Sequence, residues 1–208
     1  MLLNIINRDQ QEYGRIDILM MTVLTALSVY NGQASVFYIL YLFWWNEVLS
    51  VIIAKLFNKK DKRERNQIEK VFGLGSLFML GIYWVFILVF FGFMANWKNP
   101  DIMLINFEVL SFRNIYFDLN LVFIVLQQCS YHIAHKNYQR PTSGFSPNMI
   151  VLHISIILGG IIMFFVVLRY PEVFTPDNLW GSICIISPFL LLRYFVQTAV
   201  LRNQSIEK

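Results

Sequence analysis

Long apolar runs, separated by short polar segments, make up most of this chain. The clearest run extends from Phe37 to Phe57 and contains one carboxylate, Glu47, near its middle. A helix rises about 1.5 Å per residue, so roughly 20 apolar residues are enough to cross a bilayer. Comparable runs recur along the chain. They predict an all-α, polytopic membrane helix bundle, with transmembrane helices at about residues 18–30, 36–57, 71–97, 115–135, 148–170 and 179–201.

Two further segments have a mixed pattern that favours helices lying on the membrane surface. Residues 1–17 begin with an amphipathic stretch and lack the basic-then-apolar order of a signal peptide. They are expected to form an interfacial helix, with Asp17 at the start of the first span, where a carboxylate favours the helix dipole. Residues 98–114 are too interrupted to span, so we expect them to form a second interfacial helix against the outer leaflet.

The composition supports the same class, because 57% of the residues are hydrophobic and only 14% are charged. Soluble domains carry roughly a quarter charged residues. No sizeable soluble domain fits, so residues 1–208 are expected to form a single integral membrane domain. Most of the net charge of +4 lies in residues 55–70. A basic loop at residues 58–70, next to a span, is typical of topology control and of contact with anionic lipid head groups, and does not indicate nucleic-acid binding.

The distribution of lysine and arginine predicts the orientation. With six spans, one side of the membrane collects most of these residues, and the positive-inside rule makes that side cytoplasmic. Both termini are therefore expected in the cytoplasm of a cell with this protein in its inner membrane. The cytoplasmic set is Arg8, Arg15, Lys55, Lys59, Lys60, Lys62, Arg63, Arg65, Lys70, Lys136, Arg140, Arg202 and Lys208, and the opposite set is Lys98, Arg113 and Arg169.

Several polar side chains within the spans fall at similar depths. From the helical rise, Glu47 lies about 15 Å, Arg193 about 12 Å and His153 about 8 Å from the cytoplasmic ends of their spans. Gln128 lies near the depth of Arg193, and His132 lies one turn closer to the cytoplasm. Ionisable groups at these depths normally face a partner or a wet cavity. We therefore expect these residues to be able to meet in the cytoplasmic half of the bundle.

Three interpretations of this set stay open. In the first, Glu47 and Arg193 form a structural ion pair. In the second, Glu47 lines a cytoplasm-facing cavity and exchanges protons with His153 or His132. In the third, Arg193 extends to the membrane surface, and a neutral Glu47 bonds to Asn46 or to a backbone carbonyl.

The candidates for metal binding and catalysis are weaker. His132 and His135 stand three residues apart and His153 begins the next span, so with Glu47 they are the candidate ligands of a metal site. No C-x-x-C or H-E-x-x-H motif supports such a site, and no G-x-S-x-G motif supports nucleophilic catalysis. We therefore predict no metal, no cofactor and no catalytic residue, and favour a protein that is not an enzyme.

Two motifs carry a resemblance to a known family. LFWWNEVLSVIIAKLF, Leu42–Phe57, contains an aromatic-Trp-x-Glu pattern ahead of the basic loop, and VLHISIILGG, Val151–Gly160, contains a Leu-His-(apolar)-Gly-Gly pattern after a proline-bearing loop. Over about residues 18–201 the chain resembles the small prokaryotic integral membrane proteins known as domain of unknown function 6498. The resemblance implies no particular activity. It implies that Glu47 and His153 lie in the segments characteristic of that family.

Three functions follow as hypotheses. The first is a transport or channel-like protein with a polar cavity open to the cytoplasm around Glu47. The second is a structural or accessory membrane subunit, with a homo-oligomer or a larger membrane complex as its setting. The third is a membrane-embedded enzyme acting on lipid. A wet cavity at Glu47 would favour the first, a dry ion pair the second, and converging histidines the third.

Overall fold

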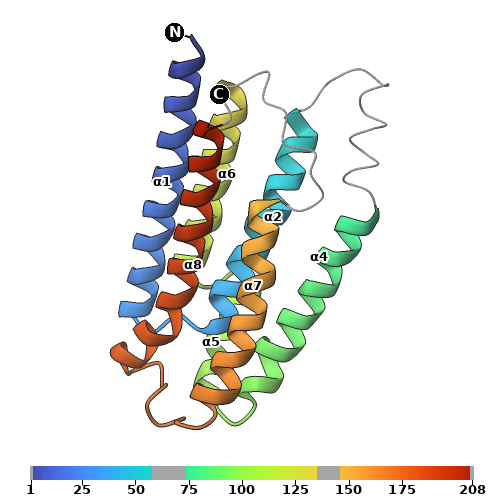
Figure 1. Ribbon diagram of the computed structural model, residues 1–208. Coiled ribbons are helices and arrows are strands. Elements are labelled where there is room, and N and C mark those ends of the chain that lie inside the picture. The colour runs from blue at the N-terminus through green and yellow to red at the C-terminus, as the bar shows by residue number, and fades with distance from the viewer. Residues whose placement is uncertain (1, 58–73, 135–145, 207–208) are drawn as a thin grey trace.

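The computed structural model describes residues 2–57, 74–134 and 146–206, and every regular element in these residues is a helix (Figure 1). The all-α prediction is therefore confirmed. The predicted basic loop at residues 58–70 and the loop that holds His135 lie outside the described residues. The elements are α1 (Leu2–Tyr30), α2 (Val36–Phe57), α4 (Leu74–Phe86) with its continuations η1 (Ile87–Phe93) and η2 (Met94–Asn96), α5 (Pro100–Leu110), α6 (Ile115–Ala134), α7 (Pro147–Ile162) with its continuation η3 (Met163–Val167), and α8 (Leu179–Ile206).

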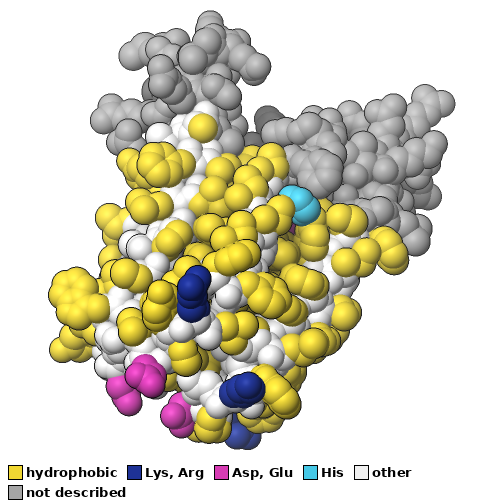
Figure 2. All heavy atoms as spheres, turned by 60° about the horizontal axis from the view of Figure 1, so that its bottom comes forward, with side chains coloured by type: hydrophobic (Ala, Val, Ile, Leu, Met, Phe, Trp, Pro, Cys, Tyr) yellow, Lys and Arg dark blue, Asp and Glu magenta, His cyan; other side chains and the backbone are white. Residues whose placement is uncertain are grey.

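The sequence predicts six spans, and among the described residues five segments are long and apolar enough to cross a membrane, which is compatible with a multi-pass membrane protein. The apolar part of α1, Ile16–Tyr30, is shorter than these segments. Figure 2 shows hydrophobic side chains covering the flanks, with charged side chains gathered towards the end opposite the termini. The five segments are Val36–Phe57, Leu77–Asn96, Pro100–Ile133, Pro147–Val167 and Leu179–Ala199.

Helix α1 differs from the prediction. The sequence predicts an interfacial helix over residues 1–17 and a separate span over residues 18–30 with Asp17 at its N-terminus, but the structure has one uninterrupted helix from Leu2 to Tyr30. The polar residues between the two parts include Gln10, Gln11 and Glu12, which favour a helix and give it no reason to break. Asp17 is therefore an internal residue of a long helix, not a residue at its N-terminus.

The long helices run alternately up and down the bundle, which brings the N-terminus and the C-terminus to the same end (Figure 1). Helix α1 packs against α6 and α8, and α2 packs against α6 and α7. Helix α2 is the central element, because every residue from Val36 to Phe43 is at most 5% exposed. A helix that is apolar and buried on all sides must lie inside the bundle.

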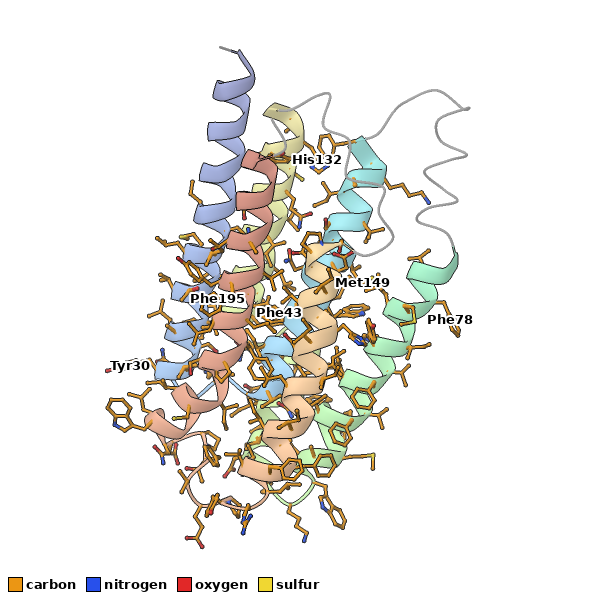
Figure 3. The ribbon with its side chains drawn as sticks, in the orientation of Figure 1. Tyr30, Phe43, Phe78, His132, Met149 and Phe195 are labelled. Carbon is orange, nitrogen blue, oxygen red and sulfur yellow. The ribbon has the colours of Figure 1, made fainter. Side chains whose placement is uncertain are left out.

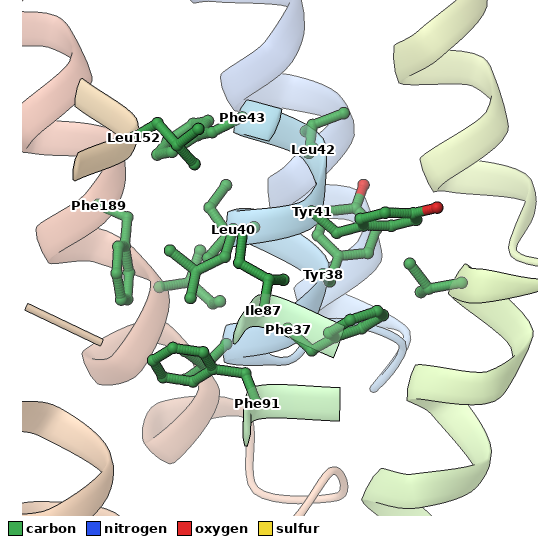
Figure 4. Packing of buried hydrophobic residues seen from close by; sticks show 14 of the residues in the cluster. Phe37, Tyr38, Leu40, Tyr41, Leu42, Phe43, Ile87, Phe91, Leu152 and Phe189 are labelled. Atoms are coloured by element: carbon green, nitrogen blue, oxygen red, sulfur yellow. The ribbon is translucent and has the colours of Figure 1, made fainter. Parts of the chain in front are cut away.

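Side chains from three directions meet α2 in the core. Figure 4 shows Phe43 beside Leu152 of α7, with Phe189 of α8 and Phe91 of η1 further along the same cluster. Gly159 of α7 allows a close approach in this core, because a Cβ atom there would lie 3.1 Å from the Phe91 ring and 3.3 Å from Leu40. A small residue at this point lets two membrane helices pack tightly.

The span that begins with α4 changes from α-helix to π-helix in η1, which alters its backbone hydrogen bonds. Two asparagines bond to carbonyl groups there. Asn96 donates to the Phe91 carbonyl at 2.8 Å, and Asn106 donates to the Gly92 carbonyl at 3.0 Å. Ser35, the residue before α2, in turn donates to Oδ1 of Asn106 at 2.6 Å. Backbone groups in a membrane protein need internal partners of this kind, because hydrocarbon offers none.

Candidate functional site

Arg193 of α8 lies at the centre of a buried polar cluster between four helices. Its side chain is 5% exposed, and its Nη2 atom donates to Oδ2 of Asp17 at 2.7 Å. One of the three interpretations of the sequence pairs Arg193 with Glu47, and the structure shows the carboxylate of Asp17 on the guanidinium group. The difference follows from α1, because the continuous helix carries Asp17 into the bundle.

Asn46 of α2 is the second partner of Arg193. The guanidinium group can only donate, so the Asn46 atom that lies 2.9 Å from Nη2 and 3.0 Å from Nη1 is the amide oxygen. The amide nitrogen of Asn46 then faces the side-chain amide of Gln128 on α6 at 3.2 Å. These four residues, Asp17, Arg193, Asn46 and Gln128, form a chain of contacts that we call the Arg193 cluster. The Phe43 ring lies 5.5 Å from the guanidinium carbon and covers one of its sides.

Glu47 is as deeply buried as the cluster beside it. Glu47 and Asn46 are each 3% exposed, and Arg193 is 4% exposed. Water therefore barely reaches any of these three side chains. Two hollows of the described chain lie elsewhere. One, of about 30 Å³, is lined by Ser35 and Asn96 among others, and the other is an open apolar surface on α4.

The two described histidines have separate partners. His132 lies towards the end of α6 (Figure 3), and its Nδ1 atom is 2.9 Å from the backbone oxygen of Gln128. His153 of α7 pairs instead with Tyr83 of α4, whose hydroxyl oxygen is 2.8 Å from Nδ1. No group of three or more His, Cys, Asp or Glu side chains in the described part of the chain is arranged to hold a metal ion.

A second polar layer lies below the Arg193 cluster, between α1, α2 and α6. Asn120 donates to the Tyr38 hydroxyl at 2.9 Å, and both residues are fully buried. The hydroxyl groups of Thr25 and Ser28 are also fully buried and face the Tyr38 hydroxyl, although neither forms a hydrogen bond of good geometry. At the end of these helices, Asn114 donates to the backbone oxygen of Gln33 at 3.1 Å.

The two buried layers share one spacing on all three helices. Residues 17 and 25 on α1, 46 and 38 on α2, and 128 and 120 on α6 are each eight positions apart. Eight residues correspond to about 12 Å along a helix. The interface between α1, α2 and α6 therefore holds polar groups at matched levels, and we call this arrangement the polar seam.

The sequence identified three residues that the structure brings together, Asn46, Gln128 and Arg193, and missed Asp17 as the fourth; Glu47 follows Asn46 in α2 and is equally buried. The available signal was the spacing of Asp17 and Thr25, which places both on one face of a continuous helix. Tyr83 was missed as the partner of His153 because no pattern on α4 sets it apart from the surrounding aromatic residues. Comparisons of the chain with protein-family models, curated proteins and solved structures found no match. The resemblance to domain of unknown function 6498 therefore stays a prediction.

Proposed function

We propose that this protein is a structural or accessory membrane protein, in which the Arg193 cluster locks α1 and α8 onto the rest of the bundle. The observation that carries the proposal is the position of Arg193, which is 4% exposed and bonded to Asp17 of α1 and Asn46 of α2. We further place both termini in the cytoplasm of a cell with this protein in its inner membrane, on the distribution of lysine and arginine.

The dryness of the cluster supports a structural role. A transport site must reach water on at least one side, whereas the side chains of Asn46, Glu47 and Arg193 have almost no contact with solvent. The apolar part of α1 is shorter than the other candidate spans and contains Asp17, so α1 gains most from a cation inside the bundle. The Arg193 cluster provides that cation.

A flux assay tests this proposal. The full chain is reconstituted into liposomes that enclose a pH-sensitive dye, and proton movement is measured under an imposed pH gradient, for the wild type and for Glu47→Gln. We expect both proteins to give the same slow leak as empty liposomes. A wild-type flux that Glu47→Gln removes would overturn the structural assignment.

A second candidate, a proton- or ion-conducting protein, is favoured by the polar seam. Its layers continue from the Arg193 cluster through Tyr38 and Asn120 to Asn114. Buried polar groups at successive levels of a bundle are common on transport routes. The same liposomes discriminate the candidates, because this one requires a flux that falls in Asn120→Leu while the protein stays folded. The lipid-acting enzyme has less support, because His132 and His153 have different partners.

A further inference from the structure

The pair formed by Tyr83 and His153 is separate from the Arg193 cluster and joins α4 to α7. Tyr83 is 7% exposed, whereas the His153 side chain is exposed. The contact between the Tyr83 hydroxyl and Nδ1 fixes the orientation of the imidazole ring. The other ring nitrogen, Nε2, is then the atom that can bind a further group.

The surroundings of His153 are apolar. His153 lies six residues after the start of α7, or about 9 Å into the span. Residues 74–97 and 147–168, which supply both sides of this flank, contain no Asp, Glu, Lys or Arg. A polar atom that faces hydrocarbon without a partner costs free energy, and an uncharged partner with an apolar body removes that cost at this depth.

An apolar track continues from His153 along the same face of α7 and into its continuation η3. Ile157, Gly160 and Phe164 follow at intervals of four, three and four residues, which places them beneath His153 on one helical face. Ile157 and Phe164 are more than half exposed, and a Cβ atom added to Gly160 would meet nothing within 4 Å. The Phe164 ring touches Phe90 of η1 at 5.6 Å between centroids, which closes the far end of the track.

We propose that His153 and this track bind an uncharged amphiphile that has a carbonyl oxygen on an apolar tail. The Tyr83 hydroxyl donates to Nδ1, which leaves the hydrogen on Nε2, and this N–H group donates to the carbonyl oxygen. The tail lies over Ile157 and Gly160 and ends near Phe164. From His153 to Phe164 the track extends about 16 Å. A lipid-soluble quinone and an acyl ester both have this chemistry.

Native mass spectrometry of the full chain in alkyl maltoside micelles tests the proposal and separates the two sources. The protein is titrated with decylubiquinone in one series and with monoolein in another. We expect saturable binding of one molecule per chain in at least one series, weakened at least tenfold by His153→Leu and abolished by Gly160→Leu. Binding in only one series identifies the head group as a quinone or as an ester.

Two control variants match these changes. Gly81→Leu adds the same side chain at another open position, two residues from Tyr83 on a different face of α4, and is expected to bind like the wild type. His132→Leu removes a histidine from α6 and is also expected to have no effect. Circular dichroism checks that each variant is folded. Gly160→Leu fills the site of the tail and leaves His153 unchanged, so it tests the track separately from the imidazole. The proposal is wrong if neither compound binds the wild type. It is also wrong if a compound that binds the wild type binds His153→Leu or Gly160→Leu equally tightly.

Discussion

The two sides of this bundle treat polar groups in opposite ways. On the side of α1, α2, α6 and α8, the charged residue Arg193 is enclosed, and its partners Asp17 and Asn46 come from two other helices. On the side of α4 and α7, the pair of Tyr83 and His153 joins only two helices, and His153 stays exposed. An enclosed charge needs several partners at once, whereas an exposed side chain needs fewer.

The packing of the spans sets α2 apart from the rest of the bundle. The α2 span is 61% buried, compared with 28–33% for the other four candidate spans. Contacts that stabilise the fold are therefore concentrated around α2 and the polar seam. On the α4 flank, exposed apolar side chains are available for contacts with molecules in the bilayer. The following variants test this contrast, beginning with the largest expected effect.

Arg193→Met is expected to destabilise the protein by about 3 kcal/mol, the lower end for a broken buried ion pair, because it leaves Asp17, which is only 15% exposed, without its cation. The measurement is the free energy of unfolding in a denaturing detergent titration. Arg169→Met, at an exposed position near the other end of the bundle, is the matched control and should change stability little. Equal losses of unfolding free energy in the two variants would mean that the enclosed position of Arg193 contributes no extra stability.

Gly159→Leu is expected to cost about 1–3 kcal/mol, because the new side chain would be forced against Phe91 and Leu40. Gly160→Leu, one residue along the same helix, points into open space and should be close to neutral. Thermal unfolding of both variants compares the closed and open faces of α7 directly. A Gly160→Leu variant as unstable as Gly159→Leu would show that the face of α7 beneath His153 is closed.

Asn106→Ala is expected to cost about 1 kcal/mol, because the side chain donates to backbone oxygens in η1. Its effect should be local to the end of the α4 span. Hydrogen exchange measured along the chain should therefore rise in residues 87–96 and stay unchanged in α1. Faster exchange in α1 would mean that the two sides of the bundle unfold together.

Tyr38→Phe is expected to have the smallest effect, about 0.6 kcal/mol, which is typical of one hydrogen bond between membrane helices. It removes the hydroxyl group that accepts from Asn120 and leaves the ring packed against Phe117. Thermal unfolding is again the measurement. A loss as large as that of Arg193→Met would show that the second layer, and not the Arg193 cluster, holds the seam together.

The sequence was sufficient for the features that depend on hydrophobicity and helical rise. The all-α bundle, with five helices long and apolar enough to span, and the burial of Glu47 follow from those two quantities. The partner of Arg193 was beyond reach because it depends on where α1 begins, and helix boundaries follow from weak local preferences. The contact between His153 and Tyr83 was also beyond reach, because sequence gives the depth of a side chain but not which neighbouring helix it faces.

A double-mutant cycle on Asp17 and Arg193 tests the central claim most directly. Unfolding free energies are measured for the wild type, Asp17→Asn, Arg193→Gln and the double variant. We expect each single variant to lose stability and the double variant to be more stable than the sum of the two losses allows, because neither charge is then left alone. Strictly additive losses would mean that the two side chains do not stabilise each other, and would contradict a lock between α1 and α8.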